Sequence, residues 1–135
     1  LAVRPLRHPE DSLLLTGDIQ AIAEKKLVKI NPTFVSSRPL RVLIVPHHGS
    51  LTSSSVSFLK ALRPQVVIIS SGFLNRFHLP HPRILARYQH NGMQVYNTAY
   101  QGAIRWRAGD PSSLSSRGNY FHTAVRHFSW PMMRR

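Results

Sequence analysis

The sequence predicts an α/β domain in which strands and helices alternate. Short apolar runs at 13–15, 42–45 and 66–69 have the continuous hydrophobic character of strands that are covered on both faces. Longer segments between them carry apolar residues at helical spacing. Because such crossovers place successive strands parallel and adjacent, the carboxyl ends of the strands are expected at one edge of the sheet.

The size and composition of the chain are those of one globular domain. With 135 residues, 42% of them hydrophobic, it can bury one moderate core. No apolar run approaches the roughly 20 residues that span a bilayer, so the chain as given is expected to be soluble. It begins on Leu1 rather than Met, which predicts a fragment of a longer protein. It contains no cysteine, so any metal must be bound by histidine and carboxylate side chains.

The charge of the chain is strongly positive. Eighteen Lys and Arg residues against five Asp and Glu residues give a net charge of +13. This predicts a polyanionic partner, nucleic acid above all, because binding releases the counterions of the phosphates. A basic surface that is merely solvated, or that faces an anionic membrane, is the alternative.

The first strand ends in a turn with a single carboxylate. Strand 13–15 runs into Thr16, Gly17 and Asp18, and Asp18 alone among the five acidic residues ends an apolar run. Two roles are open for it. It can be a ligand at the sheet edge, or it can be the N-cap of the following helix.

An amphipathic helix is predicted over 19–29. Glu24 and the lysines at 25, 26 and 29 fall mostly on its polar side. The apolar face, expected to pack on the sheet, consists of Ile19, Ile22, Ala23 and Leu27.

The stretch at 41–50 carries the strongest candidate site. Strand 42–45 ends at Pro46, which lacks an N–H for the ladder, and His47 and His48 follow directly, with Gly49 after them. Ligands of open α/β sheets bind beyond the carboxyl ends of the strands, so two imidazoles there indicate a metal or proton-transfer site. On this stretch alone, two solvated loop histidines remain the alternative.

A hydroxyl-rich segment opens the next predicted helix, which ends before Pro64. Serine and threonine at such a position are ordinary N-caps. The free N–H groups of a helix start also attract anions, so Ser50 and Thr52 are candidate phosphate contacts. The apolar residues that define this helix are Val56, Phe58, Leu59 and Leu62.

The loop that follows strand 66–69 opens on the same sheet edge. It contains Asn75 and Arg76, which are candidate DNA contacts. His81 precedes Pro82 at the first turn of another predicted helix, so it is either the cap of that helix or a metal ligand.

A closing hairpin and a tail are predicted at the end of the chain. The hairpin strands are expected at 93–97 and 103–107, joined by 98–102. The domain accordingly spans 1–108, and the serine-rich, aromatic and basic segment 109–135 is expected to be a flexible tail. Stacking on single-stranded bases or contact with an anionic membrane is its alternative role.

In this order, the motifs resemble the metallo-β-lactamase-like domain at the C-terminus of ComEC-type DNA internalisation proteins, and specifically its C-terminal half. The resemblance covers 13 to about 106. By this resemblance Asp18 matches an acidic ligand that bridges two metals, His47 and His48 match paired histidines, and His81 matches the final ligand. The motifs are Leu-Leu-Thr-Gly-Asp at 14–18, Val-Pro-His-His-Gly-Ser at 45–50, Thr-Ser-Ser-Ser at 52–55, Asn-Arg-Phe at 75–77 and Pro-His-Pro at 80–82.

Two features depart from the family pattern. The family has Gly-His-Pro-His-Pro where this chain has His78-Leu79-Pro80-His81-Pro82, so only His81 carries over cleanly. The family's His-x-His-x-Asp-His cluster, which lies in the N-terminal half of such a domain, has no match in this sequence. The chain therefore corresponds to the second half alone.

The resemblance implies both a fold and an activity. The fold is one half of an αββα sandwich, and the complete domain is expected to hold two divalent ions, Zn or Mn. The implied function is hydrolysis of the non-transported strand of incoming DNA, with Asp18, His48 and His81 as metal ligands and His47 or His48 in proton transfer. A non-catalytic DNA-binding module and a structural module of the uptake channel are the alternatives.

The resemblance also implies partners and a location. The partners are single-stranded DNA, the N-terminal half-domain and a membrane channel of the same polypeptide. The full-length protein is expected in the bacterial inner membrane, with this domain on the extracytoplasmic side.

Overall fold

The structure is a computed structural model that describes residues 1–3, 7, 10–32, 38–110 and 114–117. Within these ranges no helix has the length and apolar character that crossing a bilayer would require. The elements in chain order are β1 (Ala2–Val3), β2 (Leu13–Leu15), α1 (Ala21–Ile30), β3 (Val42–Ile44), the 3-10 helix η1 (Pro46–Gly49), α3 (Val56–Leu62), β4 (Val66–Ile69), α4 (Pro82–His90), β5 (Gln94–Asn97), α5 (Thr98–Gln101), β6 (Ile104–Arg105) and β7 (Ser115–Ser116).

The sheet confirms the predicted alternation of strands and helices. Its five strands follow the order β1-β2-β3-β4-β5, with β1 antiparallel to β2 and all other neighbours parallel. Leu14 pairs with Leu43, and Leu43 pairs with Val67, so β2, β3 and β4 run in register. Their carboxyl ends consequently meet at one edge of the sheet.

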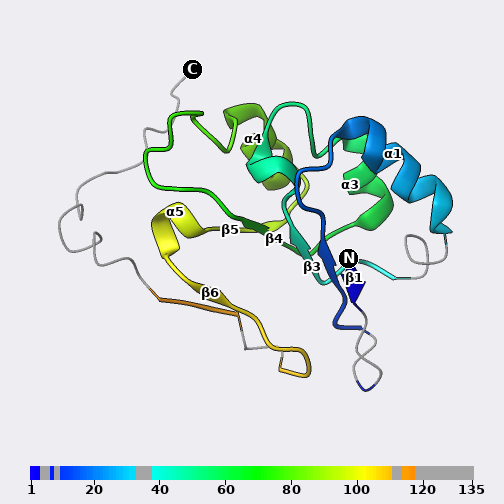
Figure 1. The fold of residues 1–135 in the computed structure, drawn as a ribbon. Coiled ribbons are helices and arrows are strands. Elements are labelled where there is room, and N and C mark those ends of the chain that lie inside the picture. Colours follow the sequence, from blue (N-terminus) through cyan, green and yellow to red (C-terminus); the bar gives the residue numbers. More distant parts are fainter. Residues whose placement is uncertain (4–6, 8–9, 33–37, 111–113, 118–135) are drawn as a thin grey trace.

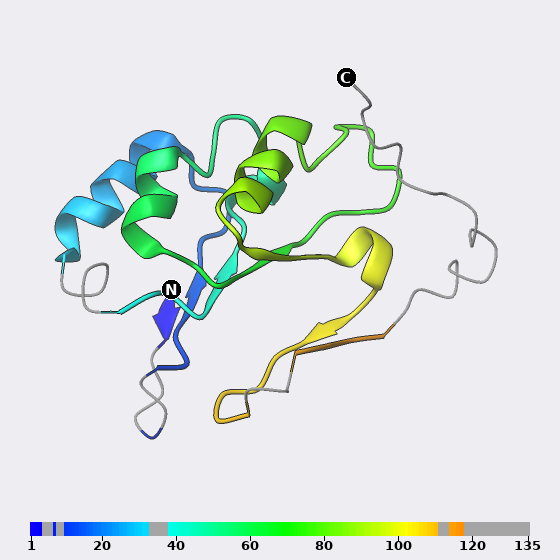
Figure 2. The same cartoon turned by 180° about the vertical axis from the view of Figure 1, so that it is seen from behind.

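Helices cover one face of the sheet. Figures 1 and 2 show α1, α3 and α4 together on the same side of the strands. Side chains alternate between the two faces of a strand, so every second strand residue joins the helix-facing core. That core includes Leu14, Leu43, Val45, Val67 and Ile69 from the sheet, and Phe58, Leu59, Leu62, Ile84 and Tyr88 from the helices.

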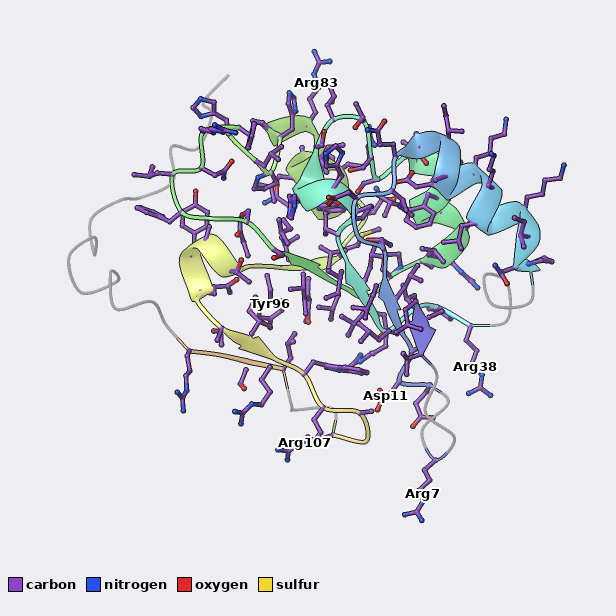
Figure 3. All side chains as sticks on the ribbon, in the orientation of Figure 1. Arg7, Asp11, Arg38, Arg83, Tyr96 and Arg107 are labelled. Atoms are coloured by element: carbon purple, nitrogen blue, oxygen red, sulfur yellow. The ribbon has the colours of Figure 1, made fainter. Side chains whose placement is uncertain are left out.

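The opposite face of the sheet carries a smaller apolar cluster. Val42, Val66 and Ile68 form its buried centre, and Tyr96 from β5 packs against them. β6 lies on this side of the sheet in Figure 1, and Figure 3 shows Tyr96 directed toward it. The sheet thus has a helical layer on one face and a short hairpin on the other.

The predicted closing hairpin between 93–97 and 103–107 is wrong in its pairing. β5 joins β4 in parallel, whereas β6 pairs with β7 in an antiparallel hairpin. The segment between β5 and β6 forms the single helical turn α5, which is capped by the Asn97 side chain accepting from the N–H of Ala99. This turn directs the chain away from β5, so the two segments cannot pair with each other. Most of the predicted tail at 109–135 lies outside the described residues; within its described part, the N–H of Gly109 donates to the carboxylate of Asp11, and β7 pairs with β6.

The predicted face of α1 needs correction. Ile22 is 77% exposed, whereas Leu27 and Val28 pack against the core. Glu24, expected on the polar side, is fully buried at 0% exposure. The buried face is therefore rotated away from Ile22, because α1 packs against α3 rather than lying flat on the sheet.

Candidate functional site

Two backbone hydrogen bonds join the loops that carry the predicted site residues. The N–H of His47 donates to the carbonyl of Gly17 at 3.0 Å, which joins the end of β3 to the turn after β2. The N–H of His81 donates to the carbonyl of Gly49 at 2.9 Å, which joins the start of α4 to the same histidine loop. The predicted convergence of these segments at one sheet edge is confirmed.

Gly49 allows the histidine loop to lie close to the loop that carries His81. Its φ is +81°, and an added Cβ would lie 2.7 Å from Cβ of Pro80. Any side chain at this position would clash with the segment that precedes His81 and would also strain the backbone. The glycine is thus required for the histidine loop to lie against the loop that carries His81.

His47 and His48 both adopt left-handed backbone conformations, with φ of 51° and 55°. This region costs a non-glycine residue about 1–2 kcal/mol, so two adjacent cases indicate a loop held under strain by its surroundings. Strained residues of this kind concentrate at functional sites.

His48 connects the ends of two neighbouring strands to its own loop. Its Nδ1 lies 2.6 Å from the carbonyl oxygen of Ser70, immediately after β4. A carbonyl oxygen only accepts, so the ring donates there through Nδ1–H. Its Nε2 lies 3.5 Å from Oδ1 of Asp18, after β2. The imidazole is therefore fixed by one nitrogen and presents the other to a carboxylate.

The contact between His48 and Asp18 has two possible states. With a proton on Nε2 it is an ion pair. Without that proton, the lone pair of a neutral imidazole faces a carboxylate oxygen, an arrangement that a cation between them would stabilise. Both groups are solvent-exposed, so a substrate or an ion has access to them. This arrangement suits either proton transfer or cation binding.

Asp18 does not cap α1, which was the alternative role predicted for it. The N-cap of α1 is Gln20, and no side chain makes the capping bond. The carboxylate of Asp18 instead lies against His48.

A group of hydroxyls lies beside His47. Nδ1 of His47 is 3.4 Å from Oγ1 of Thr52, and this oxygen is 3.2 Å from Oγ of Ser50. The buried hydroxyl of Ser53 donates to the carbonyls of Pro46 and Ser50, which holds the loop closed beneath them. Ser50 and Thr52 thus lie next to the paired histidines, and their role as phosphate contacts stays a prediction.

His81 is the N-cap of α4, as one of its two predicted roles required. Its Nδ1 accepts from the N–H of Arg83 at 3.2 Å. The cap uses Nδ1, so any further interaction of the ring must use Nε2, which lies on the other side of the imidazole.

The donors at this edge fit part of a metal site. Asp18 and His48 supply a carboxylate and an imidazole of the kind that Zn and Mn accept. Among the residues that the structure describes, however, no three histidine, aspartate or glutamate side chains gather closely enough to hold an ion. A complete site therefore needs ligands beyond these residues, and the roles of Asp18, His48 and His81 as ligands stay predictions.

The two predicted DNA contacts in the loop after β4 have different surroundings. Asn75 makes three hydrogen bonds within its own loop, donating to the carbonyls of Gly72 and Leu79 and accepting from the N–H of Leu79. Arg76 is exposed, with its guanidinium carbon 4.6 Å from the centre of the Phe77 ring. Asn75 thus organises the loop, and Arg76 is the one that faces solvent.

A buried polar network, which the sequence pattern did not reveal, supports the serine- and threonine-rich segment 50–55, which we call the hydroxyl loop. The Glu24 carboxylate accepts from the N–H groups of Ser54 at 2.5 Å and Ser55 at 2.9 Å. These amides at the start of α3 are thereby satisfied by a carboxylate of the protein itself. The signal was that Glu24 lies three and four residues before Leu27 and Val28, and so shares their buried helix face.

Tyr88 completes this network from α4. Its hydroxyl lies 2.5 Å from Oγ of Ser54, and the neighbouring Arg87 donates to the Ser54 carbonyl. Burial raises the pKa of the Tyr88 phenol well above its usual value, and the bond to Ser54 opposes part of that rise. The hydroxyl loop is thus held by side chains from both α1 and α4.

The positive charge is not confined to one side of the molecule. In Figure 3, Arg83 projects from the helical layer, whereas Arg7, Arg38 and Arg107 project toward the opposite end. Net charge alone therefore does not identify a DNA-binding face.

Comparison with known proteins relates the chain to bacterial competence and recombination proteins. It is 35% identical over 96 residues to ComE operon protein 3 of Bacillus subtilis (strain 168), covering 71% of this chain and 12% of that protein. It is 35% identical over 99 residues to competence protein ComA of Neisseria gonorrhoeae, covering 73% of this chain and 14% of that protein. It is 38% identical over 96 residues to recombination protein 2 of Haemophilus influenzae, covering 71% of this chain and 11% of that protein.

No protein-family model matches the chain. The chain spans only 11% to 14% of the length of these three relatives, so it corresponds to a small part of each. Each of these relatives nevertheless matches about seven tenths of this chain. The chain is therefore a distant homologue of the bacterial competence proteins over most of its length.

Proposed function

We propose that this chain is part of a metal-dependent nuclease domain of a competence DNA-uptake protein. Such a domain would hydrolyse phosphodiester bonds of the DNA strand that is not transported. The observation that carries this proposal is the Asp18–His48 pair at the carboxyl ends of three parallel strands, in a homologue of competence proteins. The proposed reaction requires charge neutralisation and proton transfer at a sheet edge, which these residue types suit.

Both halves of the complete domain would supply ligands to the metal. Bound divalent ions, two of Zn or Mn in the proposal, supply an activated water and neutralise charge on the phosphate. Asp18, Nε2 of His48 and the ring of His81 are this chain's proposed ligands, and the Nδ1–H bond to Ser70 keeps the His48 ring oriented. The remaining ligands would come from the N-terminal half-domain.

The paired histidines also have a proposed role in proton transfer. His47 lies beside the hydroxyls of Ser50 and Thr52, which are proposed to contact a phosphate. A phosphate bound there would place its leaving oxygen next to the histidine pair. His47 would then donate a proton to that oxygen; His48 would take this role only where its Nε2 does not hold the metal.

Further partners follow from the same proposal. The N-terminal half-domain would complete the sandwich on the sheet face now covered by β6, where Leu13, Ile44 and Tyr96 are only partly buried. The complete protein would include a membrane channel in the inner membrane, with this domain on the extracytoplasmic side.

A nuclease assay tests the proposal. The 135-residue chain and a polypeptide extended by the N-terminal half-domain are incubated with end-labelled single-stranded DNA and Mn or Zn. We expect cleavage by the extended protein, loss of cleavage in Asp18→Ala and His48→Ala, and little change in His90→Ala, which alters an exposed histidine of α4. Absence of cleavage by the extended protein would contradict the proposal. Robust cleavage by the short chain that is lost in Asp18→Ala would instead show that the upstream ligands are dispensable.

A second candidate function is a non-catalytic DNA-binding or structural module of the uptake channel. It is favoured by the net charge of +13 and by the lack of a three-ligand cluster among the described residues. Calorimetric titration of the extended protein with Zn or Mn separates the two functions, because only the nuclease requires tight metal binding.

A further inference from the structure

An exposed group of large apolar side chains lies on the loop between β4 and α4 and on the neighbouring turn α5. We call the aromatic patch the set formed by Phe73, Leu74, Phe77 and Tyr100. Phe77 is 65% exposed and Leu74 is 87% exposed, and the other two are close to half exposed. Single exposed apolar residues are common on protein surfaces, but a group of this kind usually marks an interaction surface.

The loop that presents the patch is held in place. Asn75 closes it with three hydrogen bonds, and the N–H of His78 donates to the Asn75 carbonyl at 3.0 Å. At its base, the N–H of Ser71 donates to Oγ1 of Thr98 at 3.0 Å. The rings are thus exposed on an ordered loop, and little conformational entropy remains to be lost when a ligand binds.

The rings are arranged as surfaces for stacking. The guanidinium carbon of Arg76 lies 4.6 Å from the centre of the Phe77 ring, a cation–π contact at the surface. Phe73 and Tyr100 meet edge to face with ring centres 6.1 Å apart. A cation and exposed aromatic faces therefore lie within one short loop, which matches a ligand that carries both phosphates and flat bases.

The patch lies beside a pocket, and its loop leads on to the candidate site. A pocket of ≈ 420 Å³ is lined by Leu74, Asn75 and Tyr100 from the patch side, and by Leu85 and Gln89 of α4. Its size falls in the range of small-ligand pockets, about 300–1,000 Å³. The same loop continues through Pro80, against Gly49, to His81. Figure 1 shows this loop reaching outward on the side of α5, away from α1.

We propose that the aromatic patch binds single-stranded DNA by base stacking, with Phe77 as the principal ring and Arg76 contacting an adjacent phosphate. This inference rests on the proposed function and names how its substrate strand is held. The bases of a duplex are stacked on each other, so only a single strand can offer their faces to Phe77. The net charge of +13 favours a polyanion over an apolar protein partner.

Binding of the full chain to a fluorescent oligothymidylate of about 20 nucleotides tests the proposal, with a duplex of equal length beside it. We expect Phe77→Ala to weaken single-strand binding by roughly 5- to 100-fold, because stacking on one base has about this effect. Phe77→Leu should lose nearly as much, since it keeps the apolar bulk without the ring, whereas Phe77→Tyr should retain affinity. Ile22→Ala, an exposed apolar residue of α1, is the matched control.

The salt dependence of binding distinguishes the role of Phe77 from that of Arg76. Phe77→Ala should leave the slope of log affinity against log salt unchanged, and Arg76→Ala should reduce it by about one. Thermal unfolding of each variant shows whether the fold is retained.

Several results would overturn the proposal. They are equal single-strand binding by Phe77→Ala and Ile22→Ala, full affinity in Phe77→Leu, or Phe77-dependent binding to phosphatidylglycerol vesicles without binding to the oligonucleotide. The cleavage assay above is a separate measurement. An extended protein that cleaves DNA normally with Phe77→Ala would leave the nuclease proposal standing, and stacking without cleavage would leave the stacking proposal standing.

Discussion

Replacing Glu24 by alanine should destabilise the chain more than any surface substitution on α1. The carboxylate is fully buried and accepts two backbone N–H groups, from Ser54 and Ser55. Hydrogen bonds to charged groups contribute about 1.5–3 kcal/mol each, and burial of the carboxylate offsets part of the sum. In Glu24→Ala the two amides lose their acceptor. We expect a loss of about 3 kcal/mol in the free energy of unfolding.

Urea and thermal unfolding, followed by circular dichroism, measure this loss. A change of about 3 kcal/mol corresponds to a fall in Tm of about 10 °C for a chain of this size. Glu24→Gln keeps one acceptor oxygen, so its loss in the free energy of unfolding should be about half that of Glu24→Ala. Lys26→Ala, an exposed change on the same helix, is the control and should stay within about 0.5 kcal/mol of the unchanged protein. If Glu24→Ala unfolds like Lys26→Ala, the buried carboxylate does not hold the hydroxyl loop.

Three further outcomes are expected. Gly49→Ala should lose about 1–3 kcal/mol more than Gly17→Ala, because both have positive φ but only Gly49 has Pro80 in the way; equal losses in urea unfolding would refute the close approach. Burial raises the pKa of Tyr88, so its contribution to stability should be fully present below the ordinary pKa of 10.0 and decline as pH rises above it; unfolding measured from about pH 9 to 11 should show a smaller decline in Tyr88→Phe. DNA binding should weaken at least about tenfold between about 50 and 200 mM salt, with no sequence preference, and a flat salt dependence would contradict the electrostatic argument.

Local patterns predicted the central elements correctly. The runs ending near Leu15, Ile44 and Ile69 form the three parallel strands, as expected for short apolar runs that are bounded by turn residues and covered on both faces. Ser55 is the predicted type of N-cap for α3, and Pro82 begins α4 directly after its His81 cap. Parallel strands must align their carboxyl ends, so the meeting of the loops after them also followed from the order of motifs.

Pairing between distant segments was not predictable in the same way. Adjacency along the chain favoured pairing 93–97 with 103–107. In the structure β5 instead pairs with β4, where it completes the buried sheet. The choice depends on which apolar surfaces remain uncovered after the helices have packed. The residues 93–107 carry no information about which surfaces remain uncovered, so their local pattern cannot predict the pairing.

The amino-acid order alone was enough to define the strand–helix alternation, the loops that bear Asp18, His48 and His81, and the relationship to competence proteins. Packing determined the rest. The imidazole of His48 is oriented by the carbonyl of Ser70, and Glu24 is drawn inward by two amides of another helix start. Both depend on polar groups more than twenty residues away. Hydrogen-bond partners at that separation are set by how the elements pack, and periodicity along the chain carries no information about them.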